Sequence, residues 1–180
     1  MNFTISSAYQ WPKKDEKQKT NNSEKAIKKI VSSIKNRFAK KKLKDGSTYK
    51  IAYKRLRASA GKTMLDSIIK RIETSQVVII DISDHNSNVF IELGIALQIS
   101  RTNRDISVYL IKEKTDNEKI TDKLPSDLQG YFISEYALSN SKIVYKDNNS
   151  LLMSIVGDIN DFFDKNCIYV EPIDEIDFKE

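Results

Sequence analysis

The sequence predicts a three-layer α/β fold in which a central, mainly parallel sheet of about five strands is covered by helices on both faces. Two observations predict it. Short apolar runs alternate with longer segments of helical periodicity along the 180 residues. The run at residues 77–82 is almost unbroken, as is typical of a strand buried on both faces in the middle of a parallel sheet. With 39% apolar residues, the chain is expected to form a single domain over residues 1–170, followed by an acidic tail at 171–180.

The first part of the chain predicts two strands and one helix. Residues 3–5 are expected to form a strand that runs directly into a loop at residues 6–9. A helix over residues 24–42 follows, with Ser23 as its N-cap. Its apolar residues recur at helical spacing: Ala26, Ile27, Ile30, Val31, Ile34 and Phe38. After a turn, residues 49–53 alternate like a half-buried strand.

The rest of the chain continues the alternation of helices and strands. An amphipathic helix before the central strand is marked by five apolar residues: Met64, Leu65, Ile68, Ile69 and Ile72. The remaining elements are expected as strands at residues 77–82, 106–111 and 131–136 and as helices at residues 89–99 and 151–163. In a parallel sheet of this kind, ligands bind in the crevice at the carboxyl ends of the strands. The loops after Ile5, Tyr53, Ile82 and Ile111 are therefore where functional residues are sought.

Cysteine and histidine are scarce. Cys167 is the only cysteine, which excludes an internal disulfide, and His85 is the only histidine, so we expect no metal site. The amino terminus lacks a basic flank followed by a long apolar stretch, and no apolar run approaches the ~20 residues of a membrane span. These features predict a soluble, cytoplasmic protein without a membrane partner.

Charge is distributed unevenly. Residues 1–75 hold 20 Lys and Arg against 6 Asp and Glu, whereas the rest of the chain holds 10 against 19. The first part therefore carries about +14 and the rest about −9 within a net charge of +5. A basic surface attracts nucleic acid, anionic nucleotides or an acidic protein, and it can equally be a solvated face. We do not expect nucleic acid to be the partner.

The segment at residues 81–96 has polar side chains in unusual places. Asp81 interrupts the apolar core strand near its carboxyl end, and Glu92 lies in the first turns of an otherwise apolar helix. Asn88 precedes Glu92 by four residues, so the two side chains share a helix face. We expect all three to converge on the crevice, where partial desolvation raises the pKa of a carboxyl group. An ordinary structural explanation remains open, because a Glu early in a helix and an Asn cap are both common.

The loop after the first strand supplies further candidates. Ser6, Ser7 and Tyr9 are expected to reach the same crevice, and Trp11 could stack on a base or a nicotinamide ring. His85 lies in the loop before the helix and could contact a substrate. Trp11 could also be a core or lid anchor, and His85 could simply be a solvated turn residue.

The central segment also resembles a known group of proteins. The pattern Val-Val-Ile-Ile-Asp-Ile-Ser-x-x-Asn-x-Asn-Val-Phe-x-Glu-Leu-Gly-x-Ala at residues 77–96 resembles the TIR-like and nucleoside 2-deoxyribosyltransferase-like superfamily. The resemblance extends more weakly to residues 65–72 and to Leu-Pro-Ser-Asp-Leu-Gln-Gly at residues 124–130, and it covers about half of the chain. It implies a three-layer flavodoxin-like, TIR-like fold.

The resemblance also implies cleavage of an N-glycosidic bond with Glu92 as the catalytic carboxylate. Asp81 would orient the sugar or the leaving base, and Asn88 would hydrogen-bond to the ribose. The substrate expected is NAD+, which would be hydrolysed or converted to a cyclic or conjugated ADP-ribose signal, with no separate cofactor. A role in bacterial antiviral defence is carried by the resemblance alone.

Two alternatives stay open at this point. One is a nucleoside 2-deoxyribosyltransferase or nucleotide N-glycosidase. The other is a non-catalytic nucleotide-sensing or scaffold module whose basic first part docks a partner. The resemblance is compatible with a homo-oligomer and with a partner effector protein besides the nucleotide substrate.

Overall fold

The computed structural model describes residues 2–10, 22–57, 63–114, 128, 130–140, 142–146 and 148–166. Trp11, Cys167, most of the element at residues 124–130 and the tail at 171–180 lie outside these residues. In the part that is described, none of the helices has the length and apolar character needed to cross a membrane.

Six strands form one sheet in the order β2-β1-β3-β4-β5-β6. The strands are β1 (Phe3–Ala8), β2 (Ile51–Arg55), β3 (Val77–Asp81), β4 (Ser107–Glu113), β5 (Ile133–Ser139) and β6 (Lys142–Tyr145). All neighbours are parallel except β5 and β6, which pair antiparallel. The order of the first five strands is that of flavodoxin-like folds, so the predicted fold class is confirmed.

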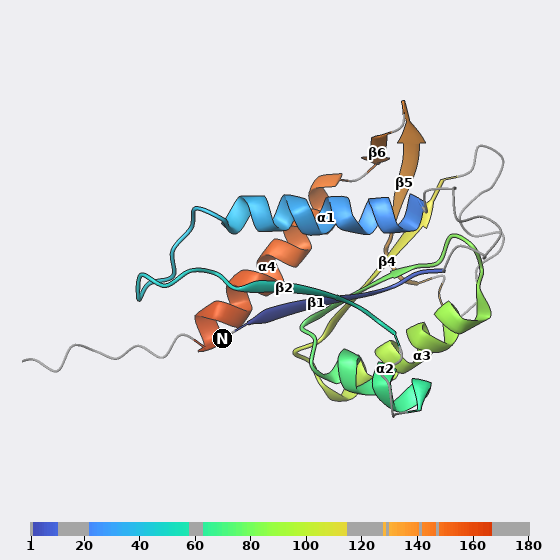
Figure 1. Ribbon diagram of the computed structural model, residues 1–180, viewed down its shortest axis with the longest axis horizontal. Helices are drawn as coiled ribbons and strands as arrows, with labels where there is room; N and C mark the ends of the chain where they lie inside the picture. The colour runs from blue at the N-terminus through green and yellow to red at the C-terminus, as the bar shows by residue number, and fades with distance from the viewer. Residues whose placement is uncertain are drawn as a thin grey trace, which may run out of the picture.

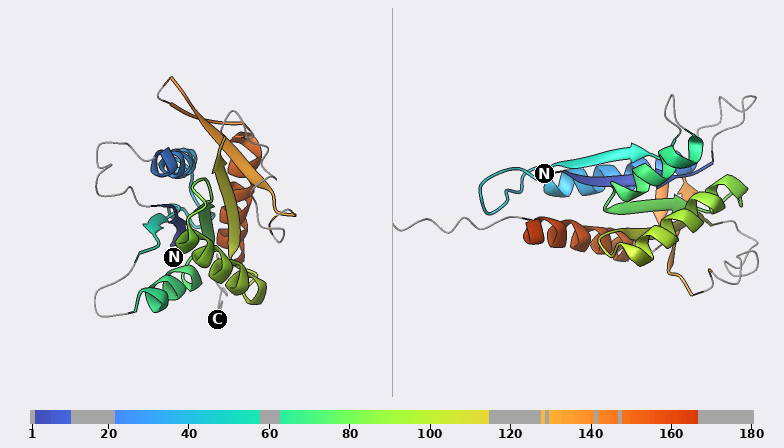
Figure 2. Two further views of the ribbon diagram at one scale, coloured as in Figure 1. Left: turned by 90° about the vertical axis from the view of Figure 1, so that its right-hand side faces the viewer. Right: turned by 90° about the horizontal axis from the view of Figure 1, so that it is seen from below.

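Four helices cover the sheet in two pairs. They are α1 (Asn22–Phe38), α2 (Met64–Glu73), α3 (Ser87–Thr102) and α4 (Asn148–Asn166). Figure 1 shows α1 and α4 above the sheet and α2 and α3 below it, and the view from below in Figure 2 looks onto α2 and α3. This arrangement produces the three predicted layers.

Each face of the sheet has its own hydrophobic core. The core under α1 and α4 contains alternate strand residues such as Ile5 and Ile79, together with the helical set predicted for α1. The core under α2 and α3 contains the intervening strand residues, such as Val78 and Ile80, with Leu93 of α3. The alternation follows from the period of two in a strand, and it decides which helix each strand residue faces.

The boundaries of the first elements differ from the sequence prediction. β1 continues through Ser6 and Ser7 to Ala8, and all six of its residues are buried, so the loop predicted at residues 6–9 is wrong over that stretch. A strand paired on both sides buries small hydroxyl residues as readily as apolar ones once their hydroxyl groups are hydrogen-bonded. α1 ends at Phe38, four residues before the predicted end, where its apolar spacing stops. A turn follows, and Gly46 adopts the positive φ of 79° that favours glycine.

The sixth strand was missed by the sequence prediction. β6 has four residues, of which only Ile143 and Tyr145 are buried, and the chain reverses into it through Asn140 at φ 48°. A strand this short carries too little alternation to be distinguished from a loop by periodicity. The Lys29 ammonium of α1 donates a hydrogen bond to the Ile143 carbonyl group, which ties the edge strand to the helix layer.

Candidate functional site

The helix α3 places Glu92 beside the amino-terminal part of α2. Asn86 caps α3, with its side-chain oxygen accepting from the backbone N–H groups of Asn88 at 2.9 Å and Val89 at 3.4 Å. This cap fixes the start of α3 at Ser87 and puts Glu92 in its second turn. Glu92 is 9% exposed, so its carboxyl group belongs to a buried wall and not to the solvated face of the helix.

A small apolar pocket lies between α2 and α3. It has a volume of about 170 Å3 and is lined by Met64, Leu65, Ile68, Asn88, Ile91 and Glu92. Glu92 contributes the only carboxyl group among these residues, and Asn88 contributes the only amide. The structure therefore confirms that Asn88 and Glu92 share a face, and it adds that this face borders an apolar hollow.

The surroundings of Glu92 favour its neutral form. Burial raises the pKa of Glu92 from its ordinary value of 4.5 to about 7, and the positive charge of Arg55 acts in the opposite direction. Near neutral pH the group is therefore divided between carboxylate and carboxylic acid. Such a carboxyl group can accept or donate a proton, and it becomes fully ionised when a cation is placed against it.

Arg55 is a site residue that the sequence prediction missed. It is the last residue of β2, and its guanidinium carbon lies 3.5 Å from the centre of the Tyr9 ring. Its Nη2 atom also donates a hydrogen bond of 3.0 Å to the Tyr9 carbonyl oxygen. The signal that could have found it is its place just past the predicted strand at residues 49–53, at one of the sheet ends singled out for function.

Tyr9 closes this part of the crevice. It follows β1 and is 5% exposed, and burial raises the pKa of its hydroxyl group to about 12, against the influence of Arg55. Tyr9 is therefore neutral at physiological pH and can act only as a hydrogen-bonding group or an aromatic surface. Of the residues predicted in the first loop, Tyr9 is the one that reaches the surroundings of Glu92 through Arg55.

Asp81 does not converge with Glu92, contrary to the sequence prediction. Asp81 shares the orientation of Val77 and Ile79 in β3, which face α1 and α4, whereas Glu92 belongs to the α2 and α3 layer. One Asp81 oxygen, Oδ2, accepts a 2.6 Å hydrogen bond from the Tyr136 hydroxyl group, and Oδ1 accepts from the backbone N–H and the hydroxyl group of Ser83. The period of two along β3 sends the side chain to the opposite face, which helical reasoning about α3 could not reveal.

The Asp81 network is a buried polar cluster within the α1 layer. Burial raises the pKa of Asp81, and the hydrogen bonds from Ser83, Tyr136 and Ser23 lower it. Its partners come from β5, from the β3–α3 loop and from the first turn of α1. The cluster therefore joins three elements, and its described partners are all groups of the protein itself.

The remaining predicted residues are placed differently from one another. Ser6 and Ser7 are fully buried within β1: the Oγ atoms of Ser6 and Ser75 lie 2.6 Å apart, and Ser7 Oγ lies 2.9 Å from the Tyr53 hydroxyl oxygen. Neither serine reaches the crevice. His85 adopts φ 48°, and within the described residues its buried Nε2 atom forms no hydrogen bond. Its ring lies 6.1 Å from that of Phe90.

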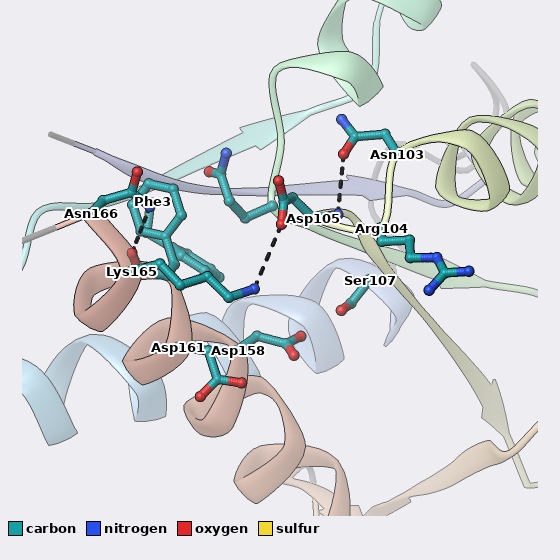
Figure 3. A pocket seen from close by; sticks show the side chains of 11 residues that line it. Phe3, Asn103, Arg104, Asp105, Ser107, Asp158, Asp161, Lys165 and Asn166 are labelled. Atoms are coloured by element: carbon teal, nitrogen blue, oxygen red, sulfur yellow. Dashed lines mark hydrogen bonds and ion pairs between the residues drawn. The ribbon is translucent and has the colours of Figure 1, made fainter.

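A larger cavity lies at the opposite end of the sheet. Its volume is about 510 Å3, and it opens where β1, β3 and β4 begin. Figure 3 shows Asp158, Asp161 and Lys165 of α4 facing Asp105, with the Lys165 ammonium 3.7 Å from an Asp105 carboxylate oxygen. None of the predicted site residues lines this cavity. Across the described ranges, no group of three or more His, Cys, Asp or Glu side chains is arranged to hold a metal ion.

The strand order and the two helix layers define the class of the molecule as a flavodoxin-like α/β domain with a TIR-like fold. No family model matches the chain, and no curated protein matches it. Among solved structures, the chain is similar to one described as the crystal structure of the RPS4 and RRS1 TIR domain heterodimer. The two share 16% identity with a TM-score of 0.45, over 89% of this chain and 97% of that chain. No function follows from a likeness of this kind.

Proposed function

We propose that the protein cleaves the N-glycosidic bond of NAD+, by hydrolysis or by conversion to a cyclic or conjugated ADP-ribose, with Glu92 as the catalytic carboxylate. The observation that carries this proposal is the 9% exposed carboxyl group of Glu92 in the wall of an apolar pocket at the carboxyl-terminal side of the sheet. The resemblance of residues 77–96 to the superfamily described above supports the same assignment.

The chemistry of glycosidic cleavage explains why such a carboxylate is useful. When the bond to the base breaks, positive charge develops on the ribose as an oxocarbenium ion. A negative charge held against that centre stabilises the transition state, and it does so more strongly where water is excluded. The apolar residues Met64, Leu65 and Ile91 supply that environment beside Glu92.

The size and the lining of the pocket suit a single flat ring. Its volume of about 170 Å3 is comparable with engineered apolar cavities of about 150 Å3 that bind benzene. The Asn88 amide beside it can donate and accept hydrogen bonds. We propose that the nicotinamide ring enters between α2 and α3 and that Asn88 hydrogen-bonds to the substrate.

The raised pKa of Glu92 favours NAD+ over an uncharged nucleoside as the substrate. A carboxyl group with a pKa of about 7 gains full ionisation only when a positive charge approaches it. The pyridinium ring of NAD+ brings such a charge, and nicotinamide leaves as a neutral base. An uncharged deoxynucleoside brings none. A role in bacterial antiviral defence is part of the proposal only through the sequence resemblance.

The test is to incubate the purified protein with NAD+, and separately with deoxynucleosides plus free bases, and to separate the products by chromatography. We expect nicotinamide release by the wild type and a loss of at least about 100-fold in Glu92→Gln, as is typical when a group stabilising the transition-state charge is removed. Glu73→Gln is the matched control, because Glu73 is an exposed residue of α2 whose loss changes the net charge equally.

The outcomes separate the candidate functions. Base exchange without nicotinamide release would indicate a deoxyribosyltransferase instead. Binding of NAD+ without turnover, including at high protein concentration that promotes assembly, would indicate a non-catalytic sensing module. Glu92→Gln with the activity of the wild type would overturn the assignment of the catalytic carboxylate.

A further inference from the structure

Arg55 lies where a substrate bound at Glu92 would extend towards β1 and β2. It ends β2, next to Tyr9 at the end of β1, and its charge acts on Glu92 of α3. These three residues come from three separate elements at the same edge of the sheet. A ligand whose glycosidic bond lies against Glu92 would therefore have the Arg55 guanidinium group on its β2 side.

The Arg55 side chain is held in place. Its guanidinium group stacks on the Tyr9 ring at 3.5 Å from the ring centre, and it donates a hydrogen bond to the Tyr9 carbonyl oxygen. The backbone is held as well, because Leu56 N–H donates to the Ser7 carbonyl oxygen at 2.8 Å and Arg71 Nη1 donates to the Arg55 carbonyl oxygen at 3.5 Å. A flexible cationic side chain that is already ordered loses less conformational entropy when it binds a ligand.

The charges around Arg55 leave it suited to an anion. Of the two carboxyl groups whose charges act on Arg55, Glu24 also forms an ion pair of 2.6 Å with Lys28, and Glu92 borders the apolar pocket. Burial lowers the pKa of Arg55, and the guanidinium group still stays charged at all physiological pH values. An arginine half-buried beside an apolar pocket is a strong site for phosphate oxygens.

We propose that Arg55 binds a phosphate group of the substrate, so that the site selects a nucleotide carrying a phosphate on its ribose over the corresponding unphosphorylated nucleoside. This inference rests on the proposed function for the position of the glycosidic bond. Tyr9 acts as the positioning residue that holds the guanidinium group by stacking. The planar donors of arginine match two phosphate oxygens, which a lysine ammonium group cannot do in the same way.

Binding of non-reacting anions tests this proposal independently of turnover. Calorimetric titration at constant ionic strength uses ADP-ribose and inorganic pyrophosphate as phosphate-bearing probes and adenosine as the uncharged probe. We expect Arg55→Met to weaken the binding of ADP-ribose by roughly 10- to 100-fold, the usual loss of hydrogen bonds to a charged group. Binding of adenosine should not change, and Arg55→Lys should fall between the wild type and Arg55→Met.

Arg57→Met is the matched control. Arg57 is exposed and only two residues further along the chain, so its replacement removes the same charge without removing the group stacked on Tyr9. It should leave the affinity for ADP-ribose within about twofold, because an exposed charge at a distance is largely screened. An equal loss in both variants would show only a general effect of positive charge and would overturn the proposal.

Kinetics provide the second measurement. NAD+ and nicotinamide riboside contain the same glycosidic bond, but only NAD+ carries phosphate. Arg55→Met should raise KM for NAD+ and leave kcat/KM for nicotinamide riboside unchanged. An equal loss on both substrates would overturn the role of Arg55 and leave the proposed function intact. If the wild type cleaves neither compound, the proposed function fails, and the binding measurements still decide the role of Arg55.

A folding control keeps the result interpretable. Thermal unfolding compares the variants, because Arg55 also links the ends of β1 and β2. Should Arg55→Met not fold, two measurements remain: the affinity of Arg55→Lys for ADP-ribose relative to adenosine, and competition between pyrophosphate and ADP-ribose on the wild type. Loss of neither selectivity nor competition would then contradict the proposal.

Discussion

Glu92 shows at the scale of a single residue how a functional group costs stability. Its carboxyl group is 9% exposed and has a pKa of about 7, against an ordinary value of 4.5. The folded state therefore holds a proton that the unfolded chain releases between these two values. The free energy of unfolding is larger at low pH, where both states are protonated, and it falls as pH rises towards 7.

The first prediction is that Glu92→Gln stabilises the protein at high pH. Glutamine has no proton to release, so the variant lacks the loss that wild type suffers as pH rises. The variant should gain up to about 3 kcal/mol relative to wild type at about pH 8, and much less at about pH 4. Urea unfolding at both pH values measures the two differences. A difference that is the same at both pH values would show that burial of Glu92 does not perturb its ionisation.

Tyr136 and Tyr145 illustrate the opposite case, in which a buried polar group is needed for stability. The Tyr136 hydroxyl group donates to Asp81 Oδ2 at 2.6 Å, whereas the buried Tyr145 hydroxyl oxygen forms no hydrogen bond with the described residues. The two rings lie 5.7 Å apart on the paired strands β5 and β6. They are therefore a matched pair that differs in one hydrogen bond.

The second prediction compares Tyr136→Phe with Tyr145→Phe. The first should lower the free energy of unfolding by about 1–3 kcal/mol, because it leaves a buried carboxyl oxygen of Asp81 without its donor. The second should be neutral or slightly stabilising. Chemical denaturation measures both, and kcat/KM for NAD+ should be unchanged in the folded fraction because Asp81 faces the α1 layer. A larger effect on kcat/KM than on stability in Tyr136→Phe would return Asp81 to the catalytic site.

At the scale of an element, α3 carries the site because its start is well defined. Its apolar residues are spread around much of the helix, and Leu93 and Ala96 are buried against the sheet while Ile91 is exposed. Such a helix has no strongly polar face to orient it from the sequence alone. The Asn86 cap and packing against α2 therefore decide where Asn88 and Glu92 point.

The third prediction is that Asn86→Ala weakens both the helix and the site. Loss of the cap should cost about 1 kcal/mol of stability, as measured by chemical denaturation. It should also reduce kcat/KM for NAD+, because the first turns of α3 hold both pocket residues. Asn86→Asp and Asn86→Ser retain a capping oxygen and should restore both quantities. If these two variants behave like Asn86→Ala, the effect of Asn86 does not come from capping.

At the scale of the whole molecule, the sheet separates two cores with different roles. The core under α1 and α4 includes Ile155 of α4, and the core under α2 and α3 includes Leu93 of α3. The candidate site belongs to the second layer and to the sheet edge, with the Asp81 cluster in the first layer. Stability and function are therefore expected to respond differently to damage on the two faces.

The fourth prediction contrasts Ile155→Ala with Leu93→Ala. Each replaces a side chain that is 2% exposed or less, so each should cost about 2–5 kcal/mol in urea unfolding. Ile155→Ala should leave KM for NAD+ unchanged at a temperature where the variant is folded. Leu93→Ala should also raise KM, because the vacated space lies next to Glu92. Equal effects on KM would mean that the two faces are coupled through the sheet.

Local patterns determined much of this molecule without tertiary information. The helical spacing from Ala26 to Phe38 and the β-branched run of β3 each predicted their element, and the alternation of elements predicted the parallel sheet and its three layers. Asn88 and Glu92 could be placed together because four residues complete about one helical turn. Each of these conclusions depends on neighbours within a few residues, which is the range over which side-chain periodicity acts.

Only the tertiary structure decided which groups meet across the fold. The alternation along β3 turned Asp81 towards α1, pairing on both sides enclosed Ser6 and Ser7, and the ends of β1 and β2 brought Arg55 against Tyr9. Arg55 and Glu92 are 37 residues apart in the sequence, and no local period relates them. The sequence by itself therefore determined the fold class and the candidate carboxylate. The face on which each strand residue lies, and the charge opposite that carboxylate, depend on strand pairing and packing between distant segments.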